Sequence, residues 1–129
     1  MRKFIASRVT AFQYAFEGWW YVIRSQRNAW LHAVFTLIIV GTGLWLGLSR
    51  PDWAIIVLAI ALVWLAEFFN TALEAVVDLA SPQQHALAKI GKDVGAAAAL
   101  IAAGTSVIIG LLILGPPLWE RIHGLWASL

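Results

Sequence analysis

The chain has 129 residues, of which 61% are hydrophobic, and its mean hydropathy is +0.80. This is too much apolar surface for a soluble domain of that size, so the composition predicts a single-domain integral membrane protein. The absence of cysteine excludes disulfide bonds, thiol catalysis and cysteine-ligated zinc. The pI near 9.4 would fit nucleic-acid binding, but the basic residues flank apolar segments as topology signals do, and we expect no nucleic-acid partner.

Residues 1–29 are predicted to form an amphipathic helix on the membrane surface, with a short lead-in to the first span. Arg8 interrupts any short apolar core and no small-residue cleavage site follows, so we expect the segment to be retained. It could serve as an anchor, or it could cover the head group of a lipid substrate. Two opposite faces repeat at helical spacing, Phe12, Phe16, Trp19, Trp20 and Ile23 on one and Gln13, Glu17 and Arg24 on the other.

Three apolar runs predict transmembrane helices at about 30–48, 53–72 and 94–114, each near the twenty residues that cross hydrocarbon. Arg50-Pro51-Asp52 predicts a tight turn between the first two spans, and Gly115-Pro116-Pro117 is expected to end the third. The predicted fold class is therefore an all-α integral membrane protein, with three transmembrane helices and one surface helix.

The basic residues predict the orientation of these spans. The N-terminal segment and the second loop carry most of the positive charge, which places both in the cytoplasm. The two sets are Arg2, Lys3, Arg8, Arg24, Arg27, Lys89 and Lys92 on the cytoplasmic side, and Arg50 and Arg121 on the other.

The second span runs into a stripe of polar residues. Glu67, Asn70, Glu74 and Asp78 are spaced three, four and four residues apart, which places them within about 80° of one helix face. A carboxylate at membrane depth costs about 3 kcal/mol, so it persists where it pairs, binds a cation or lines a wet cavity. Glu67 is therefore a candidate functional residue. Glu74 and Asp78, taken alone, would be interpreted as solvent-exposed acidic residues on the helix surface.

The second loop holds a further polar cluster. Residues 81–85 are expected to break the second helix, and Lys89, Lys92 and Asp93 then occupy about one turn at the membrane boundary. A lysine there can neutralise phosphate, or it can act only as a topology signal. His85 alone reads as a loop residue.

Together these segments resemble the prokaryotic diacylglycerol kinase family, whose small three-span members phosphorylate lipid alcohols. The distinctive pattern is Glu-x-x-Asn-x-Ala-x-Glu-x-x-x-Asp from Glu67 to Asp78, followed by Lys92-Asp93. In the segment before the first span, Arg27, Asn28 and His32 are more similar to the Gram-positive undecaprenol kinases than to the enteric diacylglycerol kinases. The resemblance therefore implies an undecaprenol kinase, with diacylglycerol as the alternative substrate.

The resemblance also implies roles for individual residues. Glu67 would be the catalytic base, and it would bind the lipid substrate together with Asn70 and Asn28. Glu74 and Gln26 would be ligands of Mg²⁺. The implied nucleotide-binding residues are Tyr14, Glu74, Asp78, Gln84, His85, Lys92 and Asp93.

One position departs from the family pattern. The family usually has a second metal-binding glutamate before the Arg-Asn pair, and Gln26 stands there in this chain. Its amide oxygen could still ligate a metal ion, or Glu17 could substitute for the missing carboxylate.

The partners implied are ATP as co-substrate, a lipid alcohol and the bacterial cytoplasmic membrane. The resemblance further implies a homotrimer with active sites shared between subunits. Small residues on the third span, among them Gly95, Ala102 and Gly104, independently favour close packing of helices from more than one chain.

A proton-coupled transporter subunit is the main alternative from another class. It would explain Glu67, but a transport site should lie near the midplane of the membrane. It leaves unexplained why Glu74, Lys92 and Asp93 gather at the cytoplasmic surface. A purely structural membrane protein would leave Glu67 without a role.

Overall fold

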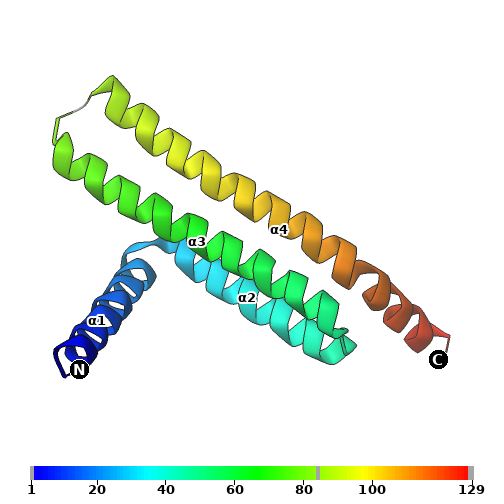
Figure 1. The fold of residues 1–129 in the computed structure, drawn as a ribbon. Helices are drawn as coiled ribbons and strands as arrows, with labels where there is room; N and C mark the ends of the chain where they lie inside the picture. The colour runs from blue at the N-terminus through cyan, green and yellow to red at the C-terminus, as the bar shows by residue number, and fades with distance from the viewer. Residues whose placement is uncertain (1, 84, 128–129) are drawn as a thin grey trace.

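A computed structural model describes residues 2–83 and 85–127 of the chain. In these two stretches it has four helices and no strand: α1 (Arg2–Ser25), α2 (Arg27–Leu46), α3 (Arg50–Ala80) and α4 (Ala86–Trp126) (Figure 1). Helices α2, α3 and α4 are each long and apolar enough to cross a membrane. The all-α fold with three candidate spans and a separate N-terminal helix is therefore confirmed.

The connection between α2 and α3 is a tight turn at residues 47–49. Gly47 has the left-handed φ of 70° that glycine adopts without strain, and its N–H donates to the carbonyl oxygens of Gly43 and Leu44. The Ser49 hydroxyl then caps α3 by accepting a hydrogen bond from the Asp52 N–H, at 3.4 Å.

The turn predicted at Arg50-Pro51-Asp52 is wrong, because these residues form the first turn of α3. Proline is favoured there, since the first helical residues have no intrahelical acceptor for their N–H groups. The acidic Asp52 also suits the positive end of the helix dipole.

Helices α3 and α4 form a long antiparallel pair that makes up most of the bundle (Figure 1). Small residues let the two backbones approach: Ala59 on α3 and Ala102 on α4 are both buried. The Ser106 hydroxyl donates across the pair to the Ala59 carbonyl oxygen at 2.9 Å. Most other apolar side chains point outward, as expected for helices that face lipid.

Helix α3 ends at Ala80 and α4 begins at Ala86, so the expected break in the helix is confirmed at residues 81–83 and 85. The Ser81 N–H donates to the Val77 carbonyl oxygen at 2.9 Å and closes α3. On the other side, His85 Nδ1 accepts a hydrogen bond from the Leu87 N–H at 3.2 Å and caps α4.

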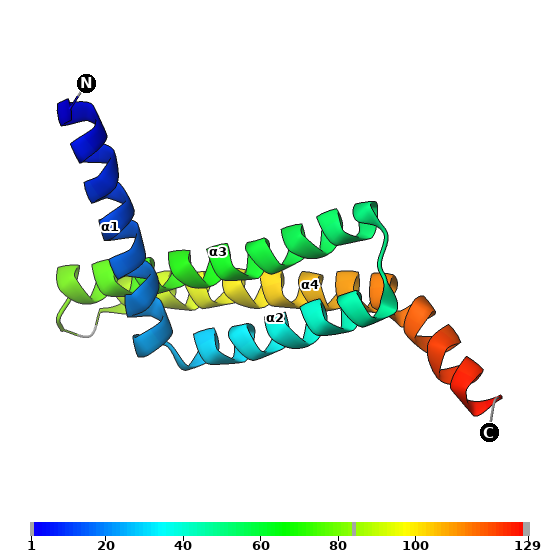
Figure 2. The same cartoon turned by 90° about the horizontal axis from the view of Figure 1, so that it is seen from below.

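Helix α4 does not end at Gly115-Pro116-Pro117, where the sequence analysis expected the third span to stop. It runs for 41 residues to Trp126, with both prolines inside it. Figure 2 shows a bend in this part of α4. Proline removes a backbone donor and crowds the preceding turn, so a bend is the expected response of a helix that continues through it.

Helix α1 leaves the bundle at a steep angle, and its C-terminal part lies beside the bundle (Figure 2). Val22 is buried there, and the Trp19 ring stacks on Trp64 of α3 with ring centroids 6.2 Å apart. Phe12 and Phe16 are more than half exposed. This exposed apolar face supports the amphipathic interpretation, and the location of α1 in the headgroup layer stays a prediction.

Candidate active site

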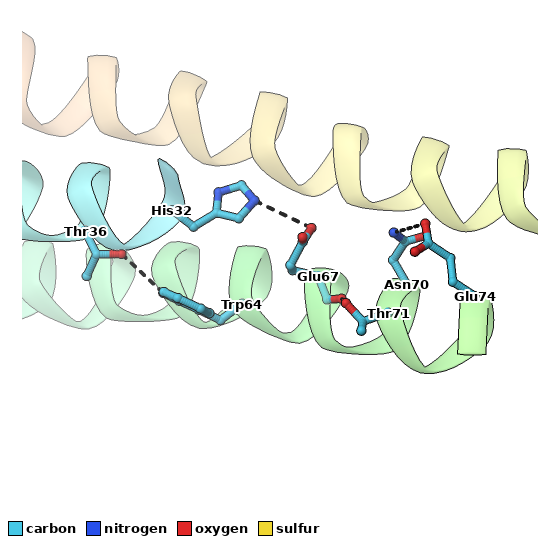
Figure 3. A network of polar contacts seen from close by, with 7 residues as sticks. All are labelled: His32, Thr36, Trp64, Glu67, Asn70, Thr71 and Glu74. Atoms are coloured by element: carbon cyan, nitrogen blue, oxygen red, sulfur yellow. Dashed lines mark hydrogen bonds and ion pairs between the residues drawn. The ribbon is translucent and has the colours of Figure 1, made fainter. Parts of the chain in front are cut away.

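The polar stripe of α3 runs from the interior of the bundle to its end. Glu67 is only 2% exposed, Asn70 and Glu74 are half-buried, and Asp78 is exposed. Figure 3 shows Glu67, Asn70 and Glu74 following one another along α3, on the side that α4 covers. The stripe therefore connects a buried carboxylate to the surface.

His32 of α2 is the neighbour of the Glu67 carboxylate. Its Nε2 lies 3.7 Å from Glu67 Oε2 (Figure 3). The histidine ring packs at an angle against Trp64, whose indole N–H donates to the Thr36 hydroxyl at 3.2 Å. One turn of α2 and one turn of α3 are thereby fixed against each other, and this holds the His32–Glu67 pair in place.

His32 belongs to the family pattern in the sequence, but the pattern alone assigns it no role. The contact with Glu67 depends on the packing of α2 against α3, which sequence spacing does not reveal. A histidine at the start of an apolar run, followed one turn later by threonine, is the one signal that could have indicated it.

Asn70 and Glu74 form a second pair, one turn along α3. The Asn70 amide Nδ2 donates to Glu74 Oε1 at 3.1 Å. Asn70 Oδ1 is buried and has no hydrogen-bond partner within the described residues. A buried amide oxygen without a partner is uncommon in native proteins and indicates a place for a hydroxyl, a water or a cation.

Gly95 of α4 makes room for this amide. A Cβ atom at Gly95 would lie 2.7 Å from Asn70 Oδ1 and 2.9 Å from Leu73 Cδ2, which is too close for either contact. The glycine therefore sets the spacing between α3 and α4 at the level of Asn70.

The far end of the stripe meets the start of α4. Lys92 pairs with Asp78 across the two helices, whereas Lys89 pairs with Asp93 within α4. A hollow of about 650 Å³ opens beside the helix connection, bordered by Asp78, His85, Lys89 and Lys92 among others. The hollow thus brings together three of the nucleotide-binding candidates, Asp78, His85 and Lys92; Gln84 lies outside the described residues.

Three other candidates lie away from the stripe. Tyr14 is exposed on α1, Asn28 is exposed in the first turn of α2, and Gln26 is half-buried in the connection between these helices. Gln26 has an extended backbone, and its side chain makes no capping hydrogen bond. In the part of the chain that the structure describes, no hydrogen bond or ion pair joins these three side chains to α3.

An apolar groove of about 550 Å³ lies between α2, α3 and α4. His32 lines one end and Leu118 the other, and most residues between them are apolar. Because His32 also contacts Glu67, the groove ends beside the buried carboxylate. A lipid tail in the groove would leave its polar end at Glu67.

The described residues contain no cluster of three histidine, aspartate or glutamate side chains that could hold a metal ion by themselves. Mg²⁺ needs no such cluster, because it is commonly held by one or two carboxylates together with substrate phosphates. Glu74 and the unpartnered Asn70 Oδ1 supply oxygen ligands on adjacent turns of α3. The donor set fits a magnesium ion that is shared with a nucleotide.

These features define the class of the protein: a small multi-pass membrane enzyme whose buried carboxylate joins an apolar groove to a polar surface site. The family model of prokaryotic diacylglycerol kinase matches residues 13–114, and the chain belongs to this family. It is therefore a lipid kinase, as the resemblance implied.

The similar proteins are kinases of two different lipid alcohols, undecaprenol and diacylglycerol. The chain is 40% identical to the undecaprenol kinase of Bacillus subtilis over 108 residues, which are 84% of this chain and 88% of that protein. It is also 40% identical to the diacylglycerol kinase of Synechocystis over 111 residues, 85% of this chain but only 63% of that protein. The diacylglycerol kinase of Escherichia coli is 30% identical over 117 residues, 85% of this chain and 96% of that protein.

Proposed function

We propose that this protein transfers the γ-phosphoryl group of ATP to the hydroxyl of a membrane lipid alcohol, and that the preferred alcohol is undecaprenol. The observation that carries the proposal is the position of Glu67, buried where the apolar groove meets the polar stripe. Diacylglycerol is the alternative substrate. The 40% identity to an undecaprenol kinase along 88% of its length supports the preference, together with Arg27, Asn28 and His32.

Glu67 is the general base of the proposed reaction. Its carboxylate takes the proton of the lipid hydroxyl as that oxygen forms a bond to the γ-phosphorus of ATP. The bond from this phosphorus to the bridging oxygen of the β-phosphate breaks, and ADP leaves. His32 would be a positioning residue, because its Nε2 lies 3.7 Å from the Glu67 carboxylate.

The nucleotide would lie along the stripe, with its γ-phosphate near Glu67 and the rest of the molecule toward the α3–α4 connection. Lys92, now paired with Asp78, would neutralise phosphate charge, and His85, Gln84 and Asp93 would border the nucleotide. Glu74 and the unpartnered Asn70 Oδ1 would hold Mg²⁺, whose chemistry is to offset negative charge on the phosphates, and the Asn70 side chain would also bind the lipid substrate together with Glu67. Phosphoryl transfer needs mainly positioning and charge neutralisation, which this set of side chains provides.

The N-terminal candidates fit a shared site. Tyr14, Gln26 and Asn28 do not join the α3 stripe of their own chain through hydrogen bonds or ion pairs among the described residues. In a homotrimer, a neighbouring subunit would supply them to the nucleotide and substrate. Gln26 would then offer its amide oxygen to the metal, with Glu17 on α1 as the alternative ligand.

The orientation in the membrane follows from charge. Basic residues before α2 and around the α3–α4 connection support a nucleotide site on the cytoplasmic side, where ATP is available. The groove would then extend from this side into the hydrocarbon.

The first experiment compares phosphate transfer from ATP to undecaprenol and to diacylglycerol, using purified protein in mixed micelles with and without magnesium. We expect magnesium-dependent product, and more of it from undecaprenol. The opposite ratio would make diacylglycerol the substrate. Transfer to neither lipid, by protein that retains its helical circular dichroism, would contradict the proposal.

Glu67→Gln tests the role of the base. We expect turnover to fall by about 10²–10⁴-fold, because the amide cannot accept the proton, while binding of magnesium-ATP is retained. Glu120→Gln is the matched control, since Glu120 is exposed near the C-terminus of α4, away from the stripe. Equal turnover in the two variants would show that Glu67 is not the general base.

A further inference from the structure

The last turns of α4 are a separate structural feature. Residues 118–126 follow the bend at Gly115-Pro116-Pro117 and lie beyond residue 114, where the family match ends. They lie at the opposite end of the bundle from the α3–α4 connection (Figure 1). Leu118 also lines the end of the apolar groove, but the proposed kinase reaction makes no use of residues 119–126.

These residues are strongly amphipathic. At about 100° per residue, the five apolar side chains fall within an arc of about 120°, and the polar residues and one glycine occupy the rest. The apolar arc holds Leu118, Trp119, Ile122, Leu125 and Trp126, and the polar arc holds Glu120, Arg121, His123 and Gly124. Trp119 is 66% exposed and Trp126 is 76% exposed, so the protein itself leaves the apolar arc largely uncovered.

The length of α4 places this segment outside the hydrocarbon. Its 41 residues correspond to about 60 Å of helix, roughly twice the thickness of the apolar part of a bilayer. The Arg121 guanidinium lies over the Trp45 ring, 5.9 Å from its centre, at the C-terminal end of α2. The segment therefore begins at the level where another span ends.

We propose that residues 118–126 form an interfacial helix, which lies on the membrane face opposite the polar site and inserts its apolar arc between headgroups and acyl chains. Trp119 and Trp126 belong to the residue type that favours this layer. Glu120 and Arg121 offset each other's charge. The partner is therefore the bilayer surface itself, bound through apolar and aromatic contact, with no need for anionic lipid.

The absence of cysteine allows the proposal to be tested with single spin labels. Ile122→Cys and Leu125→Cys place a label on the apolar arc, and Glu120→Cys and Gly124→Cys place it on the polar arc. Leu112→Cys, at a 70% exposed position before the bend, gives the reference for a lipid-facing label. Each labelled full-length protein is reconstituted in phosphatidylcholine vesicles, with or without phosphatidylglycerol, and its accessibility to oxygen and to a nickel chelate is measured.

We expect the labels at Ile122 and Leu125 to collide with oxygen, as the Leu112 label does, and those at Glu120 and Gly124 to collide with the nickel chelate. The pattern should be the same in both kinds of vesicle. Nickel access at all four positions would mean a helix in water, and shielding of all four from both reagents would mean packing against a second copy. A pattern seen only with phosphatidylglycerol would mean electrostatic binding; any of these three results overturns the proposal.

Discussion

At the scale of single residues, Glu67 is a charged side chain in a buried position, which is energetically unfavourable. A carboxylate inside a membrane bundle costs about 3 kcal/mol on insertion scales, and here only 2% of the residue is exposed. His32 lies 3.7 Å from it, while the Thr71 hydroxyl donates to the Glu67 backbone carbonyl and not to the carboxylate. The carboxylate thus keeps capacity for another hydrogen bond, which the hydroxyl of a substrate can supply.

Removing His32 tests whether this contact positions the base. In His32→Leu we expect kcat to fall about 10–100-fold because the carboxylate loses its fixed orientation, with little change in the KM for ATP. His123→Leu is the control, since that histidine is exposed near the C-terminus. Steady-state kinetics in mixed micelles give both constants, and a rise in KM alone would assign His32 to binding.

A substitution at Gly95 tests the role of the Asn70 side-chain amide. Gly95→Ala would bring a Cβ atom within 2.7 Å of Asn70 Oδ1, so the amide must move and its hydrogen bond to Glu74 should break. We expect a weaker response to magnesium and a loss of about 1–3 kcal/mol of stability from overpacking. Gly41→Ala, on α2 with nothing within 4 Å of the added atom, should match the unmodified protein in magnesium titrations and should not lose stability in thermal unfolding.

At the scale of elements, the α3–α4 pair presents two lysines in different settings. Lys92 reaches across to Asp78, whereas Lys89 pairs with Asp93 on its own helix. Side-chain exposure also separates them, at 38% for Lys92 and 78% for Lys89. A partly buried lysine between two helices is the better candidate for contact with phosphate, because solvent screens its charge less.

We therefore expect Lys92→Gln to raise the KM for ATP about tenfold, the equivalent of one charge-assisted hydrogen bond to phosphate. Lys89→Gln should change it much less. Both variants remove one positive charge from the same part of α4, so the comparison separates a specific contact from the general field. Equal effects of the two substitutions would contradict a direct role for Lys92.

The elements also show how far the sequence could predict the structure. The three spans and the polar stripe follow from the length of the apolar runs and from helical spacing. The helix ends near the prolines could not be predicted in this way, because proline is compatible with more than one local structure. It favours turns, but it also favours the first turn of a helix, as at Pro51, and it can bend a helix that continues, as at Pro116. The His32–Glu67 contact and the need for Gly95 beside Asn70 arise only when the helices pack.

At the scale of the whole molecule, one chain supplies an incomplete set of proposed ligands. The α3 stripe and the start of α4 bring Glu67, Glu74 and Lys92 along one face. The N-terminal candidates, such as Asn28, stay apart from it. If the chain forms the proposed homotrimer with shared sites, a complete site needs α3 from one subunit and the start of α2 from another.

Mixing two defective variants tests this arrangement. Glu67→Gln and Asn28→Ala are each expected to be inactive as pure oligomers, because every site lacks either the base or the amide. After the two are unfolded together in equal amounts and reassembled, about a quarter of shared sites would combine an intact Glu67 with an intact Asn28 from its neighbour. Phosphate transfer should therefore recover to about that fraction of the activity of unmodified protein treated in the same way.

The controls decide between shared and separate sites. Each variant reassembled alone should stay inactive. Activity of Asn28→Ala reassembled alone would mean that Asn28 is not needed in the active site. If each site lies within one chain, mixing cannot combine the two intact residues, and the mixture should stay as inactive as its components. Lack of recovery, with chemical cross-linking showing that mixed oligomers did form, would therefore contradict the shared site.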